Sequence, residues 1–241
     1  MAHILRNYWL YGRALDPGVD GWVWGQAGSL LAAICLGALL FRGGVWAGRA
    51  SVRHFSTHFG LSVSPGYAAV HAGLGRVAML AGGLYGALVG WGAWGVPGLW
   101  LLVLPAWALA LALVDGALLL LPDVLTLGGL WLGLASAWAG FGLVGLHTAV
   151  AGALFGYLFL YALFLLYRLW RHCDGMGGGD LKLAAAIGAW VGPAPLAQVL
   201  LVACCAAAGY SLALRLAGRP AGRLPFGPFL GFALSLYLVA M

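Results

Sequence analysis

Residues 99–114 read LWLLVLPAWALALALV, an apolar run without a charged side chain, and Asp115 follows it directly. A membrane-spanning helix needs roughly 20 apolar residues, so this run covers most of one crossing of a bilayer. Comparable runs recur along the 241-residue chain, at 22–41, 77–95, 124–145, 148–167, 181–192, 196–214 and 225–241. The sequence therefore predicts an all-α, polytopic membrane helix bundle with about eight transmembrane helices.

The composition excludes an ordinary soluble domain. Hydrophobic residues make up 63% of the chain and charged residues only 7%, whereas soluble domains carry about a quarter charged residues. The formal net charge of +6 does not indicate a nucleic-acid partner, because the basic residues lie between apolar runs and not on one face of a soluble body. We expect a lipid bilayer around the chain, no nucleic acid, and no cleavable signal peptide, since no small-residue cleavage site follows the first apolar run.

The distribution of Lys and Arg predicts the orientation, because basic loops near span ends stay in the cytoplasm. Ten of the twelve basic residues fall on one side of the predicted spans, and only Arg6 and Arg13 fall on the other. The ten are Arg42, Arg49, Arg53, Arg76, Arg168, Arg171, Lys182, Arg215, Arg219 and Arg223. We therefore expect a non-cytoplasmic segment over 1–21 and a membrane domain over 22–241, which includes a cytoplasmic loop at 42–76.

Glycine is abundant, with 40 residues, and three glycines repeat every four residues in one apolar run. Gly82, Gly86 and Gly90 would lie on one face of a helix over 77–95. Small residues let membrane helices approach closely. We interpret this face as a helix-packing surface.

The six acidic residues are all aspartates, and four of them fall at the cytoplasmic ends of predicted spans. Such a carboxylate is costly unless it faces a wet cavity or a partner. Asp123 follows a proline and precedes an apolar run, where a helix N-cap belongs. Asp174 lies in a polar stretch typical of a solvated turn. Asp115 and Asp180 have no comparable structural explanation and are the candidate functional residues.

Two carboxylates in a partly dry site can share one proton, because their repulsion raises the pKa of one of them. One can then act as a general base on water and the other as a general acid on a carbonyl. Gly177, Gly178 and Gly179 precede Asp180 and would leave room for an extended substrate backbone. Lys182 lies about 200° around a helix from Asp180, so we expect it to point away and extend toward the headgroups.

Three stretches resemble the type IV prepilin peptidases, which are bacterial membrane aspartic proteases with a GxGD motif. They are VDGALLLLPDVLT at 114–126, GMGGGDLKL at 175–183 and LPFGPFL at 224–230. Their order and separations also match that family. The similarity covers roughly residues 77–241.

This resemblance implies an aspartic endopeptidase with Asp115 and Asp180 as the catalytic pair and no metal. Asp123 and Lys182, with the three glycines before Asp180, are the supporting motif residues. The implied substrates and partners are type IV prepilins or type II secretion pseudopilins, whose short basic leader is removed. The implied location is the bacterial inner membrane, with the active site toward the cytoplasm.

The first predicted loop departs from the family pattern. Many members carry two CxxC pairs there and also methylate the new amino terminus with S-adenosylmethionine, but residues 42–76 contain no cysteine. We therefore expect neither a zinc-bound loop nor a cofactor, and S-adenosylmethionine only if a methyltransferase activity is retained, against which this loop argues. His54, His58 and His71 have no nearby acid or thiol and are interpreted as surface residues, not as a metal site.

Two alternative functions use the same aspartates. A metal-dependent lipid or prenyl transferase would hold Mg²⁺ against a diphosphate, which generally needs clustered acids and basic groups that reach phosphate. A proton-coupled transporter would use Asp115 and Asp180 as a relay. Transporters often contain internal repeats, and this sequence shows none.

Overall fold

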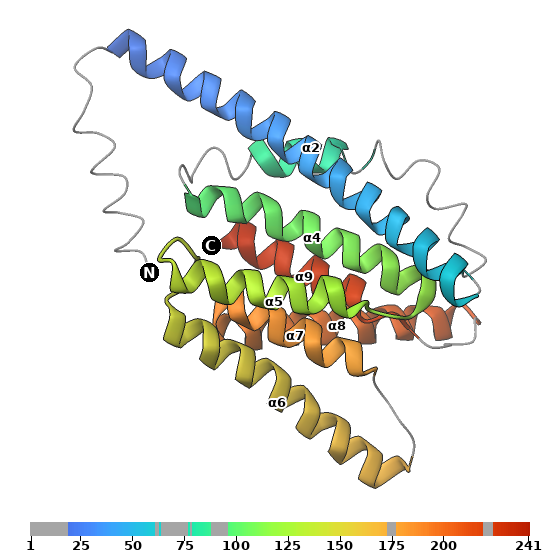
Figure 1. Ribbon diagram of the computed structural model, residues 1–241. Coiled ribbons are helices and arrows are strands. Elements are labelled where there is room, and N and C mark those ends of the chain that lie inside the picture. The colour runs from blue at the N-terminus through green and yellow to red at the C-terminus, as the bar shows by residue number, and fades with distance from the viewer. Residues whose placement is uncertain are drawn as a thin grey trace.

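The structure, a computed structural model, describes residues 19–60, 63, 77, 79–87, 96–172, 177–218 and 224–241. Within these residues all regular structure is helical, which confirms the predicted all-α class. Residues 79–87 are helical, and the other helices, shown in Figure 1, are α2 (Val19–Phe59), α4 (Val96–Leu118), α5 (Asp123–Trp138), α6 (Leu146–Arg171), α7 (Gly178–Val191), α8 (Pro193–Leu216) and α9 (Gly227–Ala240).

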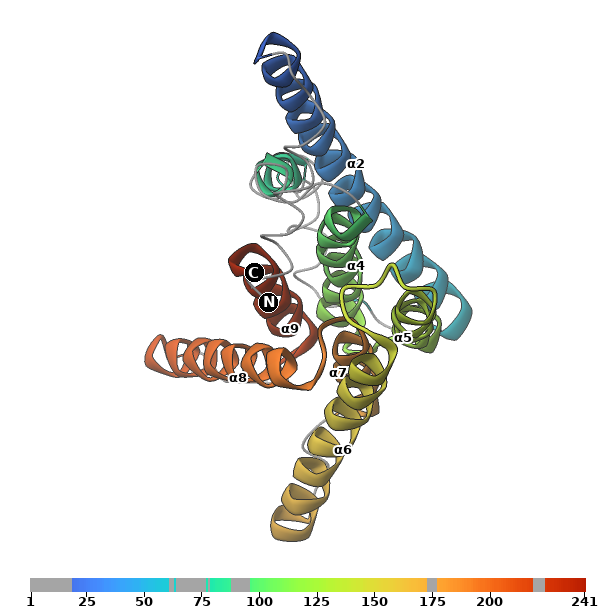
Figure 2. The same cartoon turned by 90° about the vertical axis from the view of Figure 1, so that its left-hand side faces the viewer.

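Four of the described helices are long and apolar enough to cross a membrane. The crossing segments are Leu30–Phe59 in α2, Gly98–Leu118 in α4, and the whole of α6 and α8. Figure 2 shows α6 and α8 extending away from the other helices, and both expose many large apolar side chains. An apolar exterior of this kind is stable against lipid and not against water. The chain is therefore a polytopic helical membrane protein, as predicted.

Helix α7 is short but central, with α5, α6, α8 and α9 packed around it (Figure 2). Its residues from Leu181 to Val191 are buried, apart from the partly exposed Lys182. Glycines bring α6 close to it: a Cβ added at Gly152 would lie 2.1 Å from the Gly188 carbonyl oxygen. This close packing fixes the first turn of α7, where Asp180 lies.

Helix α2 differs from the sequence prediction, because it continues unbroken to Phe59 and makes residues 42–59 helical. The polar residues there interrupt the apolar run along the sequence but not the apolar face of the helix. Val45 and Val52 are buried, and a Cβ added at Gly44 would lie 2.4 Å from the Ala106 carbonyl oxygen of α4. A buried stripe at helical spacing thus maintains the helix beyond the predicted span.

The packing predicted for the glycine-rich face is confirmed where the structure describes it. A Cβ added at Gly82 would lie 2.4 Å from the Gly37 carbonyl oxygen, and one at Gly86 would lie 2.3 Å from the Ala33 carbonyl oxygen. Gly90 falls outside the described residues, as do 1–18 and 64–76. The domain division and the cytoplasmic placement of 42–76 stay predictions.

The helix ends that carry the sequence motifs meet at one end of the bundle. A contact between Asp115 and Gly227 joins the end of α4 to the start of α9, and an ion pair between Asp123 and Lys182 joins the starts of α5 and α7. The predicted site residues, although distant in sequence, are therefore close in space.

Candidate active site

Asp115 lies in the last turn of α4, and its side chain is only 5% exposed. The neighbouring Val114 and Ala117 pack on Val52 of α2, which holds this turn in place. The helix ends soon afterwards because Leu119 adopts a left-handed conformation with φ of 51°, an uncommon geometry for a residue other than glycine. The chain then turns toward α5, which leaves the Asp115 carboxylate at the edge of the helix bundle.

Asp180 lies in the first turn of α7, outside the four long apolar helices. Gly177 is the N-cap residue, and its carbonyl accepts a hydrogen bond from the Asp180 N–H at 3.2 Å. Burial and, to a smaller extent, the charge of Asp115 together raise the pKa of Asp180 to about 7, although a backbone hydrogen bond from Gly177 lowers it. Asp180 can therefore hold or release a proton near neutral pH.

The two aspartates line one cavity of about 310 Å³. All seven residues predicted for the site line it: Asp115, Asp123, Gly177, Gly178, Gly179, Asp180 and Lys182. Leu119, Leu120 and Leu121 complete the described lining. The cavity combines two partly dry carboxylates with open backbone, an arrangement suited to general acid and base chemistry on an extended chain.

The three glycines before Asp180 differ in their surroundings. A Cβ added at Gly179 would lie 2.8 Å from the Leu121 Cβ, so glycine there allows α7 to contact the loop after α4. A Cβ at Gly178 would meet nothing within 4 Å, and one at Gly177 would lie 3.8 Å from Oδ2 of Asp180. Gly179 thus serves packing, while Gly177 and Gly178 leave space beside Asp180.

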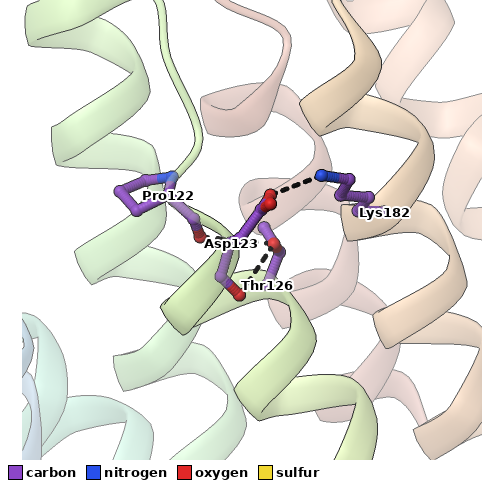
Figure 3. A network of polar contacts seen from close by, with 4 residues as sticks. All are labelled: Pro122, Asp123, Thr126 and Lys182. Atoms are coloured by element: carbon purple, nitrogen blue, oxygen red, sulfur yellow. Dashed lines mark hydrogen bonds and ion pairs between the residues drawn. The ribbon is translucent and has the colours of Figure 1, made fainter.

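Asp123 does not cap α5, so that sequence prediction is wrong. Pro122 is the N-cap residue and makes no side-chain cap, and Asp123 is the first helical residue. Its Oδ1 accepts a hydrogen bond from Nζ of Lys182 at 2.5 Å, as Figure 3 shows, and the Thr126 hydroxyl donates to the Pro122 carbonyl at 3.2 Å. The carboxylate has a counter-ion on another helix, a partner that the sequence analysis did not consider for Lys182.

Gly227 is a residue of the site to which sequence reasoning assigned no role. Its N–H donates a buried hydrogen bond to Oδ2 of Asp115 at 2.7 Å. The sequence did contain a related indication, because Gly227 lies in the LPFGPFL motif at 224–230 that resembles the family. The motif by itself predicted no contact with Asp115. Only the packing of α9 on α4 reveals that the motif reaches the candidate catalytic carboxylate.

Among the described residues, no group of three or more His, Cys, Asp or Glu side chains could hold a metal ion. His54 and His58 are exposed neighbours on α2, with ring centroids 4.4 Å apart. His71 and Asp174, which the sequence analysis placed at the surface and in a turn, lie outside the described residues.

In a comparison with known protein families, the sequence model of the type IV leader peptidase family matches residues 102–212. A prepilin leader peptidase/N-methyltransferase of Burkholderia pseudomallei (strain 1026b) is 46% identical over 134 residues, which cover 54% of this chain and 43% of the relative. One of the same name from Pseudomonas putida is 40% identical over 174 residues, covering 71% of this chain and 57% of the relative.

A third relative is the type 4 prepilin-like proteins leader peptide-processing enzyme of Escherichia coli O78:H11 (strain H10407 / ETEC). It is 38% identical over 142 residues, which cover 58% of this chain and 52% of the relative. The chain spans about half the length of the curated relatives that it matches, and no solved structure matches it. The family match includes both candidate catalytic aspartates and the Asp123–Lys182 pair. Residues 102–212 of this chain therefore match the type IV leader peptidase family.

Proposed function

We propose that this chain is a membrane-embedded aspartic endopeptidase with Asp115 and Asp180 as its catalytic pair. The observation that carries the proposal is the meeting of these two carboxylates, from α4 and α7, in one cavity at the end of the bundle. Two acids in a partly buried site destabilise each other, so a purely structural role would not favour their juxtaposition. Their arrangement is suited to sharing a proton.

The reaction follows from one shared proton. The ionised carboxylate takes a proton from a water molecule, and the resulting hydroxide attacks the carbonyl carbon of the scissile peptide bond. The protonated carboxylic acid gives its proton to the carbonyl oxygen. The tetrahedral intermediate then collapses as its C–N bond breaks. The leaving nitrogen takes the proton that came from water, and the proton on the former carbonyl oxygen returns to the carboxylate that supplied it.

The proposed substrate is the short basic leader of type IV prepilins or type II secretion pseudopilins. The chain carries a formal charge of +6, yet three aspartates and only one lysine line the cavity. An acidic cavity on a basic protein complements a basic peptide. The space beside Gly177 and Gly178 would allow the substrate backbone to approach Asp180.

The proposed location of the site is the cytoplasmic face of the bacterial inner membrane. Arg168 and Arg171 lie in the last turn of α6, and Arg215 lies in the last turn of α8. In the chain, α7 follows α6 and α9 follows α8, and the starts of α7 and α9 carry Asp180 and Gly227. Basic residues at this end of the bundle favour a cytoplasmic orientation.

The proposal is limited to the peptidase reaction, although several relatives are named as N-methyltransferases as well. Residues 42–59 form part of α2 and contain no cysteine. The two histidines there have no third ligand among the described residues. The cysteine pairs that many family members carry in the first loop are therefore missing from this segment, and we propose no N-methylation for this chain.

The test is coexpression with a prepilin or pseudopilin, followed by the gel mobility of the substrate. We expect wild type to remove the leader, and Asp115→Asn and Asp180→Asn each to leave it attached. Asp20→Asn is the matched control, because it neutralises an aspartate near the start of α2, far from the cavity-lining residues in sequence. Processing at the wild-type level by either cavity variant would contradict the assignment.

A further inference from the structure

The start of α9 brings a backbone donor to Asp115, one of the two candidate catalytic carboxylates. The N–H of Gly227 meets Oδ2 of Asp115 at 2.7 Å, across a separation of 112 residues in the chain. Both residues are buried. This contact lies beyond residues 102–212, where the family match ends.

The local structure of α9 makes this N–H available. Gly227 is the first helical residue after the N-cap Phe226, and the first four N–H groups of a helix have no partner within the helix. The Phe226 carbonyl accepts hydrogen bonds from Phe229 and Leu230, both at 3.1 Å, which fixes the turn. Leu230 is fully buried in the core and anchors it further. The donor is therefore held rigidly toward α4.

Close approach explains why a glycine occupies this position. A Cβ added at Gly227 would lie 2.8 Å from Oδ2 and 3.1 Å from Cβ of Asp115. Contacts this short require one partner to move, and both belong to packed helices. Any side chain larger than hydrogen would displace the carboxylate from its hydrogen bond.

We propose that Gly227 is a positioning residue of the peptidase, and that its N–H selects Asp115 as the carboxylate that takes the proton from water. Asp180 is then the acid that protonates the substrate carbonyl. This inference rests on the proposed peptidase function and deepens it by assigning the two chemical roles.

The assignment follows from the different surroundings of the two acids. A backbone N–H that donates to a carboxylate stabilises its charged form, and Oδ1 of Asp115 stays available to a water molecule while Oδ2 accepts this hydrogen bond. Asp115 is buried and Asp180 is partly buried, and Asp180 in addition has the negative charge of Asp115 beside it, so its pKa rises to about 7 although Gly177 donates a backbone hydrogen bond to its carboxylate. We therefore infer that, at neutral pH, the shared proton resides on Asp180.

The other charged groups around Asp115 do not reverse this order. Asp123 and Lys182 line the same cavity but neutralise each other as an ion pair. Helix α2, which packs on α4, carries Arg49 and Arg53, and neither of these residues lines the cavity. Helix α9 carries no charged side chain.

The first experiment compares Gly227→Ala with Gly231→Ala in the full-length protein and a prepilin cleavage assay. Gly231 also faces α4, where an added Cβ would lie 3.3 Å from the Ala108 carbonyl oxygen and away from any carboxylate. We expect Gly227→Ala to lower kcat about tenfold or more, with KM within about twofold, because it acts on the carboxylate that takes the proton from water. The acidic limb of its pH–rate profile should move up by about one pH unit, whereas Gly231→Ala should keep the wild-type profile.

Wild-type kcat in Gly227→Ala, or an even loss of rate across the pH range, would overturn the positioning role. A packing defect alone would give the even loss, so melting temperatures of both variants in detergent are measured alongside. If wild type leaves the leader attached, or if Asp115→Asn still cleaves, the proposed function itself fails. The two failures are therefore distinguishable.

A second measurement does not depend on the folding of Gly227→Ala. Infrared difference spectra of the resting protein near pH 6 detect a protonated carboxyl group. We expect that band in wild type and in Asp115→Asn, and its loss in Asp180→Asn. The opposite pattern, with the band lost in Asp115→Asn and retained in Asp180→Asn, would reverse the assigned roles.

Discussion

Two pairs of charged side chains line the same cavity, and they differ in sign and in burial. Asp123 and Lys182 are opposite charges with side chains 58% and 35% exposed, so solvent and mutual attraction both stabilise them. Asp115 and Asp180 are like charges that are largely withdrawn from water. The first pair connects α5 to α7 at little energetic cost. The second opposes folding and is retained by the packing of α4, α7 and α9, which points to chemistry and not to stability.

The largest expected difference between the pairs is in catalysis. Asp115→Asn or Asp180→Asn should lower the cleavage rate by about 10²- to 10⁴-fold, because each removes one general acid or base. The melting temperature should stay the same or rise, since a like-charge repulsion is relieved. Leader cleavage and thermal unfolding in detergent provide the two measurements. A large loss of stability in either variant would show that the acids support the fold.

The pH dependence of the cleavage rate should reflect the raised pKa of Asp180. As pH rises through about 7, Asp180 loses the proton that the reaction needs, so kcat should fall about tenfold per pH unit above this value. Cleavage rates measured between pH 5 and pH 9 check this. A rate that stays constant up to pH 9 would contradict the role of Asp180 as the acid.

The same group predicts how stability varies with pH. Asp180 binds its proton more tightly in the folded chain than in the unfolded chain, where the pKa of Asp is about 3.9. Its contribution to stability is therefore complete below about pH 4 and is lost as pH rises through about 7. Between pH 5 and pH 8 the melting temperature of wild type should fall more than that of Asp180→Asn. Parallel curves would argue against a raised pKa.

Substitutions at the neighbouring glycines should distinguish a position that is tightly packed from one that faces open space. Gly179→Ala places a Cβ 2.8 Å from the Leu121 Cβ, so we expect it to reduce the free energy of unfolding by about 1–3 kcal/mol. Gly178→Ala meets nothing within 4 Å and should leave stability unchanged or slightly higher. Chemical denaturation in detergent compares the two variants. Equal effects would mean that the contact with Leu121 does not restrict position 179.

The smallest expected effect belongs to the exposed ion pair. Asp123→Asn and Lys182→Met should each change the free energy of unfolding by about 1 kcal/mol or less, as solvent-exposed pairs generally do. A double-mutant cycle at low and high salt measures their coupling, which should weaken as salt is added. A coupling free energy well above about 1 kcal/mol that does not change with salt would show that the pair behaves as a buried ion pair.

Local patterns in the sequence were sufficient for much of the fold and the site. Apolar runs predicted the membrane helices, and elimination of simpler roles isolated Asp115 and Asp180. Both inferences work because hydropathy and the cost of a charge near lipid depend on a residue and its immediate neighbours. The same reasoning was wrong for Asp123 because the partner of that residue, Lys182, is 59 positions away.

The predicted loop at 42–76 shows a second limit of local reasoning. Arginines interrupt the apolar run after residue 41, yet α2 continues to Phe59 because Val45 and Val52 remain buried at helical spacing. Averaging hydropathy over a sequence window does not detect this stripe of buried residues, although the packing of α2 on α4 depends on it.

By itself, the sequence determined that this protein is a polytopic helical membrane protein and which two aspartates lack a structural explanation. Only the tertiary structure decided that seven motif residues line one cavity and that Lys182 neutralises Asp123. It alone also revealed that the N–H of Gly227 binds Asp115. The physical reason is that these interactions differ in range along the chain. The preference for burial depends on each residue itself, whereas these hydrogen bonds and ion pairs join atoms that only the packing of distant helices brings within 3 Å.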